Sequence, residues 1–233
     1  MTVAVLALQG DFAAHIKALA ARGIAARAAR RVGEIESAEA VVLAGGESTT
    51  MLRLLEGTGI GEALRRCAAA RVPIFATCAG MILLASKVTN PSQPSLGILD
   101  VEVERNGYGR QLDSAVAAVV GEPGGPWPKC SLEGVFIRAP RVTRWGTGVE
   151  ILARRGRDPV VIRQDRILAV TFHPELTMAS PVVDLFIAGF APEKLVSSLR
   201  GAETADGHPD GANSSAGRRA TGANCSTESA DES

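Results

Sequence analysis

Short apolar runs alternate with helix-forming stretches in the first part of the chain. Three runs, at residues 3–8, 40–44 and 72–77, are almost continuously apolar, which is typical of strands buried on both faces of a sheet. Helices are predicted at 12–22, in a short segment ending at Leu55, at 61–70, and after the third strand to about Ser86. This order of elements predicts βαβ units.

The middle of the chain is richer in short strands, which are separated by glycine, proline and charged turns. They are predicted at 98–104, 115–120, 135–137, 149–153, 160–163 and 167–171. A last helical stretch covers about 182–199, with interruptions expected near Gly189 and Pro192. Together the elements predict a single three-layer α/β domain over residues 1–200, with a mixed sheet.

Residues 201–233 differ in composition from the rest. They include no Val, Ile, Leu, Met, Phe, Trp or Tyr, and they carry six acidic residues against two arginines. So few apolar groups cannot offset the conformational entropy lost on ordering, and we therefore predict a disordered, low-complexity acidic tail.

The composition also excludes several classes of protein. Lys plus Arg and Asp plus Glu both number 25, so the charge favours neither nucleic acid nor a membrane surface as a partner. The run at 3–8 is too short for a signal peptide or a membrane span, and no later segment is long enough. The four cysteines form no CxxC pair and no zinc-like cluster with histidine, so we expect no metal, no cofactor and a reducing cytoplasm.

Cys78 stands at the end of the third apolar run, and Ala79 and Gly80 lead from it into a helix. This layout is typical of a nucleophile elbow, where a sharp turn lifts one side chain above the edge of the sheet. The positive end of the helix favours the thiolate, and backbone N–H groups at the turn can bind an oxyanion. The segment predicts nucleophilic attack on a carbonyl, with a buried structural cysteine as the alternative.

A cysteine nucleophile usually needs a base, and the base needs a group that orients it. His173 follows the strand predicted at 167–171 and begins the segment His173-Pro174-Glu175. Cys78 and His173 thus both lie past the carboxyl ends of strands, where α/β sheets bind ligands. We predict His173 as the base and Glu175 as its partner, the alternative being a histidine that ends a strand at the surface. His15, on the first helix, is expected to be a surface or interface residue.

The segment Gly45-Gly46-Glu47-Ser48 also joins a strand to a helix. One interpretation is a phosphate-binding loop, since glycine loops at helix N-termini bind anions. The chain has no GxGxxG, GKS or GKT pattern here, and Glu47 would repel a phosphate, so a loop that holds a zwitterionic amino acid and faces an oxyanion fits better. Ser48 or Thr49 is the expected helix N-cap.

Arg105 and Arg138 each stand at a predicted boundary between a strand and a loop. Either guanidinium could bind a substrate carboxylate bidentately. Most arginines at such boundaries are simply solvated, so the residues by themselves leave both interpretations open.

Six segments occur together and in one order: Gln9-Gly10-Asp11, Gly45-Gly46-Glu47-Ser48-Thr49-Thr50-Met51, Ala76-Thr77-Cys78-Ala79-Gly80, Arg105-Asn106 with Gly109-Arg110-Gln111, Phe136-Ile137-Arg138-Ala139-Pro140, and Phe172-His173-Pro174-Glu175-Leu176. Together they resemble the glutaminase subunits of pyridoxal 5'-phosphate synthase, a family of triad-type (class I) glutamine amidotransferases. The resemblance covers residues 1–198. Many amidotransferases share the elbow and the His-Pro-Glu segment, and the second, fourth and fifth segments narrow the match.

The resemblance implies a flavodoxin-like three-layer fold with a mixed, mostly parallel central sheet. It also implies hydrolysis of L-glutamine to L-glutamate and ammonia through a cysteine thioester, in a large hetero-oligomer whose synthase subunit uses the ammonia to make pyridoxal 5'-phosphate (vitamin B6). By position, Cys78 would be the nucleophile, and His173 with Glu175 would complete a catalytic triad. The residues expected to contact glutamine are Gly46, Glu47, Ser48, Arg105, Ile137 and Arg138, and the oxyanion donors are the N–H groups of Gly46 and Ala79, with Gln9 nearby.

Two positions depart from the family pattern. Ala44 stands where proline usually precedes the double glycine, and Ala76 replaces the first glycine of a G-x-C-x-G elbow. Two other functions are considered: a glutaminase for another synthase, of the imidazole glycerol phosphate type, and a non-catalytic, DJ-1-like binding protein. The family-specific segments disfavour the first, and the His-Pro-Glu segment disfavours the second.

Overall fold

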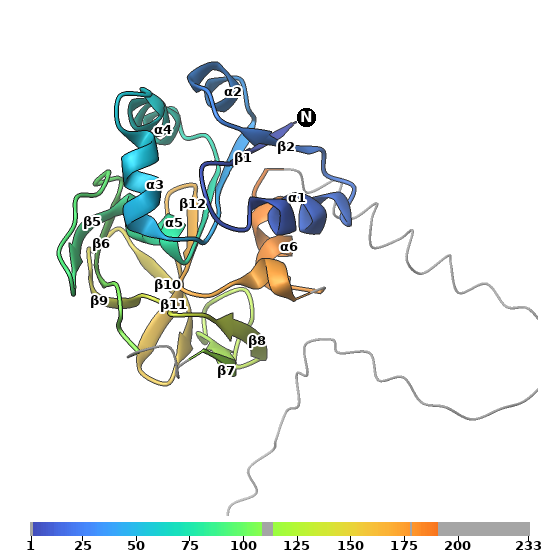
Figure 1. The fold of residues 1–233 in the computed structure, drawn as a ribbon. Coiled ribbons are helices and arrows are strands. Elements are labelled where there is room, and N and C mark those ends of the chain that lie inside the picture. Colours follow the sequence, from blue (N-terminus) through green and yellow to red (C-terminus); the bar gives the residue numbers. More distant parts are fainter. Residues whose placement is uncertain (1, 109–113, 178, 191–233) are drawn as a thin grey trace, which may run out of the picture.

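A nine-stranded sheet forms the centre of the computed structural model, which describes residues 2–108, 114–177 and 179–190 (Figure 1). The strand order is β2-β1-β3-β4-β12-β11-β10-β7-β8. The strands are β1 (Val3–Leu6), β2 (Ala26–Ala29), β3 (Ala40–Leu43), β4 (Ile74–Thr77), β7 (Ala115–Gly121), β8 (Ser131–Phe136), β10 (Glu150–Arg155), β11 (Asp158–Gln164) and β12 (Ile167–Val170).

The sheet has a parallel and an antiparallel half. All pairs from β2 through β12 are parallel, and the pairs from β12 through β8 are antiparallel. The parallel half, in the order β2-β1-β3-β4-β12, has the flavodoxin-like order 2-1-3-4-5 when its five strands are numbered along the chain. The predicted flavodoxin-like class with a mixed sheet is confirmed.

Helices cover both faces of the parallel half. The helices α1 (Phe12–Ala20) and α6 (Pro181–Ala188) pack on one face, and α2 (Val32–Glu36), α3 (Ser48–Leu55), α4 (Ile60–Ala69) and α5 (Ala79–Leu84) pack on the other. Figure 1 shows the sheet between α1 and α6 on one side and α3 and α4 on the other. In β3, Val42 belongs to the core under α1, whereas Val41 and Leu43 belong to the opposite core, because successive strand side chains point to opposite faces. This explains why the strand is apolar throughout.

A smaller sheet in the order β5-β6-β9 packs beside the main one. Its strands are β5 (Ala85–Thr89), β6 (Leu99–Glu104) and β9 (Arg141–Trp145). The helix predicted to about Ser86 therefore ends at Leu84, and β5 begins at the next residue, Ala85. Four elements, β2, α2, β5 and β9, were not predicted from the sequence. The residues of β2 are three alanines and one arginine, which have little preference for strands, so this strand is stabilised by its pairing with β1.

Parts of the predicted C-terminal region lie outside the described residues. The helix predicted at 182–199 is seen as α6, which ends at Ala188 with Gly189 as its C-cap. Residues 191–199 and the predicted tail at 201–233 are not among the residues that the structure describes. In the described part of the chain, no helix is long and apolar enough to cross a membrane.

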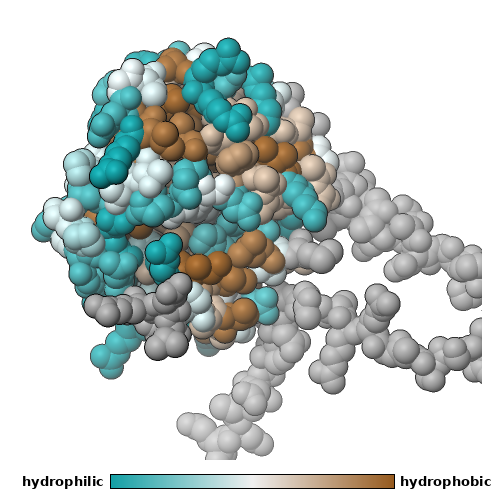
Figure 2. Space-filling model, in the orientation of Figure 1, coloured by the Kyte–Doolittle hydropathy of each residue, from teal (hydrophilic) through white to brown (hydrophobic). Residues whose placement is uncertain are grey.

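Apolar surface, in brown, lies over the region of β7 and β8 in the space-filling view (Figure 2). In β7, Val116 and Val120 are 64% and 48% exposed. The alternating exposure of this strand is typical of a sheet that faces solvent on one side. The antiparallel half is thus less completely covered than the parallel half.

Candidate active site

The loops that follow β1, β3, β4 and β12 meet at one edge of the sheet, where their strands end. They supply Gln9, Gly46, Cys78 and His173 to a pocket of about 200 Å³. Because parallel strands end at the same edge, residues far apart in the sequence converge there. This edge holds the candidate active site.

Cys78 occupies the turn between β4 and α5. Its backbone has φ 47° and ψ −106°, a strained conformation for a residue with a side chain, and its N–H donates to the Val170 carbonyl at 2.9 Å. The residue is 5% exposed, and its sulfur lies 3.9 Å from the Ile137 carbonyl oxygen. The predicted elbow is therefore present, and Cys78 lines the pocket.

His173 lies three residues past the end of β12 and is held from two sides. Its N–H donates to the Val135 carbonyl at 2.8 Å, and its Nδ1 lies 2.8 Å from Glu175 Oε1. Pro174 begins a short 3₁₀ helix, η2 (Pro174–Leu176), which turns Glu175 back beneath the imidazole. The Glu175 side chain is completely buried. With Nδ1 facing the carboxylate, the other ring nitrogen is left for Cys78.

The electrostatics of these three residues are coupled. Burial favours neutral His173, but hydrogen bonds and negative charge from Cys78 and Glu175 outweigh it and raise the pKa of His173 to about 10. Burial likewise opposes ionised Glu175, but the neighbouring His15 and His173 rings outweigh it and lower its pKa to about 2. The arrangement therefore favours the protonated, cationic form of His173 beside an ionised Glu175.

Neighbouring side chains lie so close to Gly45 and Gly46 that both positions require glycine. A Cβ on Gly45 would lie 2.4 Å from His173 Cε1 and 3.3 Å from Cys78 Cβ. A Cβ on Gly46 would lie 2.4 Å from Gln9 Oε1, which also accepts the Glu47 N–H at 2.5 Å. Side chains at these positions would displace the imidazole or Gln9, so the loop can face the sulfur only as backbone.

Glu47 is the N-cap of α3, in place of the predicted Ser48 or Thr49. Its carboxylate accepts from the Thr50 N–H at 2.7 Å, which the Ser48 side chain does not do. Burial alone would raise the pKa of Glu47, but its hydrogen bonds with Thr50 and the nearby charge of Arg105 keep the pKa below its usual range. A longer carboxylate thus performs the role expected of a hydroxyl.

Arg105 and Ser48 both have partners at the rim of the pocket. Arg105 Nη2 donates to Glu47 Oε1 at 2.8 Å, so this guanidinium is not merely solvated. Ser48 Oγ donates to Gln93 Oε1 at 3.1 Å. The pocket therefore carries a negative and a positive group side by side.

Arg138 and Ile137 form the opposite rim. Arg138 has φ 45°, a left-handed conformation that is uncommon for a residue with a side chain, and its side chain is exposed. Ile137 is 40% exposed and also lines the pocket. The structure thus brings to the pocket each residue expected to contact glutamine: Gly46, Glu47, Ser48, Arg105, Ile137 and Arg138.

Glu175 and Ala79 are the predicted site residues that do not line the pocket. Glu175 lies behind His173, and Ala79, 1% exposed, follows Cys78 at the start of α5. Asn106 and Ile82 line the pocket without having been singled out from the sequence. Ile82 stands four residues after Cys78, one helical turn along, which is the signal that could have identified it.

The expectation for His15 was wrong. The residue is 2% exposed, and its Nε2 lies 3.1 Å from Thr77 Oγ1 and 3.3 Å from Glu175 Oε2. A single histidine on an amphipathic helix gives no local sign of which buried group it will meet. It is neither a surface nor an interface residue.

The two departures from the family pattern fit the backbone. Ala44 and Ala76 are fully buried, and neither has a positive φ that would require glycine. Ala76 lies within β4, paired with β3 and β12. Arg110 and Gln111, from the fourth family segment, lie outside the described residues.

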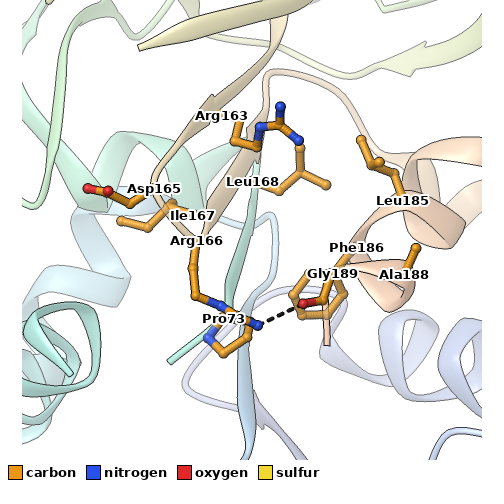
Figure 3. Close-up of a pocket in the computed structure, with 10 residues that line it drawn as sticks. All are labelled: Pro73, Arg163, Asp165, Arg166, Ile167, Leu168, Leu185, Phe186, Ala188 and Gly189. Atoms are coloured by element: carbon orange, nitrogen blue, oxygen red, sulfur yellow. Dashed lines mark hydrogen bonds between the residues drawn. The ribbon is translucent and has the colours of Figure 1, made fainter. Parts of the chain in front are cut away.

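A second cavity, of about 370 Å³, lies at the opposite end of β4 and β12 (Figure 3). Arg166 in its wall donates to the Gly189 carbonyl at 2.7 Å, and Asp165 lies 3.3 Å from Arg71. Its lining includes no histidine or cysteine. Among the described residues, no group of three or more His, Cys, Asp or Glu could hold a metal ion. The nucleophilic chemistry is thus concentrated around Cys78.

The sequence is similar to known proteins of one kind. The SNO glutamine amidotransferase family matches residues 5–191. A relative from Koribacter versatilis is 46% identical over 188 residues, covering 80% of this chain and 94% of the relative. A relative from Thermus thermophilus is 48% identical over 177 residues, covering 75% and 90%. Both are named pyridoxal 5'-phosphate synthase subunit PdxT.

A solved structure agrees with this similarity. It is titled a crystal structure of glutamine amidotransferase, and it matches with a TM-score of 0.73 and 43% sequence identity. The match covers 80% of this chain and 97% of that chain. Fold and sequence therefore point to the same group of proteins.

Proposed function

The chain belongs to the SNO glutamine amidotransferase family, and from this premise we propose that it hydrolyses L-glutamine to L-glutamate and ammonia for the synthesis of pyridoxal 5'-phosphate. The observation that carries the proposal is the buried His173–Glu175 pair, at 2.8 Å, beside a cysteine held in a strained elbow. That combination supplies a nucleophile, a proton carrier and an orienting group.

Cys78, His173 and Glu175 act in this proposal as a catalytic triad. The Cys78 sulfur, as the thiolate, attacks the side-chain carbonyl carbon of glutamine, and the electrons of the C=O bond move to the oxygen. When the C=O bond re-forms, the C–N bond breaks, and His173 gives its proton to the leaving nitrogen so that ammonia departs. Glu175 holds the imidazole and stabilises its charged form.

Hydrolysis of the thioester completes the cycle. A water molecule gives a proton to neutral His173 and adds to the thioester carbonyl. The C–S bond then breaks, which releases glutamate and restores the thiolate beside protonated His173. The N–H groups of Gly46 and Ala79 stabilise the oxyanion in both halves of the reaction, and the steric demand for glycine at 45 and 46 supports a backbone-lined wall there.

Glutamine is held by Gly46, Glu47, Ser48, Arg105, Ile137 and Arg138 in this proposal. The volume of about 200 Å³ suits a small amino acid, since pockets for drug-sized ligands are roughly 300–1,000 Å³. The Glu47–Arg105 pair offers both signs of charge, as the ammonium and carboxylate groups of an amino acid require. A phosphate would instead meet the Glu47 carboxylate.

The proposal extends to a partner. The curated relatives are named as subunits of pyridoxal 5'-phosphate synthase, and we infer that this chain delivers ammonia to a synthase subunit within a cytoplasmic hetero-oligomer. The same names do not favour the imidazole glycerol phosphate type or a DJ-1-like binding protein.

The test is ammonia release from glutamine, measured with and without the synthase subunit. Cys78→Ala is expected to reduce release at least about a thousandfold, since Cys78 is the only cysteine among the described residues that line the pocket. Cys67→Ala is the matched control, because Cys67 is a buried cysteine on α4, away from the pocket, and should keep wild-type activity. Substantial turnover by Cys78→Ala, or none by the wild type with its partner, would contradict the proposal.

A further inference from the structure

His15 is a buried titratable residue that the reaction described above does not use. Its ring packs edge-on against Phe75, with centroids 6.0 Å apart and an interplanar angle of 89°, so its orientation is fixed. The same ring nitrogen, Nε2, lies 3.1 Å from Thr77 Oγ1 and 3.3 Å from Glu175 Oε2. One nitrogen therefore faces both the residue before the nucleophile and the carboxylate behind the base.

Glu175 needs a second donor. Its side chain is completely buried, and Oε1 is occupied by His173 Nδ1 at 2.8 Å. Oε2 is also buried. It lies 3.3 Å from His15 Nε2, but it accepts no hydrogen bond of good geometry from any of the described residues. A buried carboxylate oxygen without a donor carries a large desolvation cost. His15, in the tautomer that carries its hydrogen on Nε2, is placed to supply that donor.

We propose that His15 is a positioning residue: its Nε2–H holds Glu175 Oε2, which keeps Oε1 on His173 Nδ1 and the other ring nitrogen directed at Cys78. The inference rests on the proposed function, because it deepens the account of the same triad. Thr77 shares the nitrogen and adjoins Cys78 in the chain, so α1 also braces the elbow from behind. His15 touches no reacting atom and acts only through Glu175 and Thr77.

Removing the His15 ring should change the pKa values of Glu175 and His173 in definite directions. The neighbouring His15 ring helps to lower the pKa of Glu175, so its removal raises that pKa and weakens the anion beside His173. The pKa of His173 then falls, and the loss of its proton occurs at lower pH. The other titratable group in this chain of contacts is Cys78, while Arg22, on the same side of the molecule, is hydrogen bonded to Asp184 of α6 at 2.5 Å.

The experiment compares His15→Leu, His15→Gln and Leu19→Val in the full chain with its synthase partner. His15→Leu is expected to lower kcat about ten- to a hundredfold, as for loss of a hydrogen bond to a charged group, with KM nearly unchanged. It should also shift the alkaline limb of the pH profile to lower pH. His15→Gln keeps an N–H donor and should recover most of both. Leu19→Val, one turn along the same buried face, should lower only the thermal midpoint.

A second measurement needs no substrate. The rate at which iodoacetamide alkylates Cys78 is followed against pH in each variant, and His15→Leu should change this profile where Leu19→Val does not. Wild-type kcat and an unshifted profile in His15→Leu would overturn the inference, as would equal losses in His15→Leu and His15→Gln. If the wild type released no ammonia, the proposed function would fail, and the alkylation profiles would still decide the role of His15.

Discussion

His173 is the residue on which the charges of the pocket converge. Its pKa is raised to about 10, so its favourable contribution to folding is complete below the ordinary 6.5 and is lost as the pH rises through 10. The pKa of Glu175 is lowered to about 2, so its contribution is present above the ordinary 4.5 and is lost as the pH falls through 2. The two residues therefore both stabilise the fold fully between pH 4.5 and 6.5.

The sulfur of Cys78 helps to raise the pKa of His173. We expect Cys78→Ala to lower the pKa of His173, because the neighbouring anion and its hydrogen bond are lost while burial, which lowers this pKa, remains. The imidazole is titrated by NMR in the wild type and in the variant. Cys67→Ala should leave the titration unchanged, and a pKa that stays near 10 in Cys78→Ala would show that the sulfur is not its cause.

At the scale of elements, the elbow depends on how closely α5 packs against β3. A Cβ on Gly80 would lie 2.3 Å from the Leu43 carbonyl oxygen, so the helix can pack there only with glycine at its second position. The same contact places Cys78 opposite the loop that follows β3. The small residues after the nucleophile thus have a packing role as well as a local conformational one.

Gly80→Ala tests this packing. We expect the free energy of unfolding to fall by about 1–3 kcal/mol, as for overpacking in a core where backbone must move. Gly33→Ala is the matched control, because Gly33 lies within α2 with no atom in the way of a Cβ, and alanine is the better helix former. Urea unfolding followed by circular dichroism measures both. Equal stability of Gly80→Ala and the wild type would mean that α5 can shift away from β3.

For the whole molecule, the layered fold determines which distant residues meet. The parallel order of β1, β3, β4 and β12 brings loops from four parts of the sequence to one edge, and α1 on the face of the sheet brings His15 behind the triad. The family match ends at residue 191, before the segment predicted to be a tail. The division into a domain at 1–200 and a tail at 201–233 remains a prediction.

Truncation after Arg200 tests that division. We expect the free energy of unfolding to stay within about 0.5 kcal/mol of the full chain, because residues 201–233 have almost no apolar surface to bury. Ammonia release with the synthase subunit should also be unchanged. A loss confined to the partner-dependent reaction would instead place the tail in the contact between subunits.

The sequence by itself determined the features that depend on local pattern. Continuous apolar runs located β1, β3 and β4, since a strand buried on both faces needs apolar residues throughout. The change from strand to helix at Cys78 and the segment His173-Pro174-Glu175 were also visible, because both are patterns of neighbouring residues. The resemblance to a family then supplied the list of residues that line the pocket.

Only the tertiary structure decided the features that depend on contacts between distant residues. The edge strand β2 gains its order from pairing with β1, which its own residues do not indicate. Glu47, which caps α3, accepts a hydrogen bond from the Arg105 guanidinium, 58 positions away in the sequence. His15 and Glu175 meet only because α1 crosses the sheet near the end of β4. Periodicity reports which face of an element is buried, but the partner across that face is set by how the layers pack.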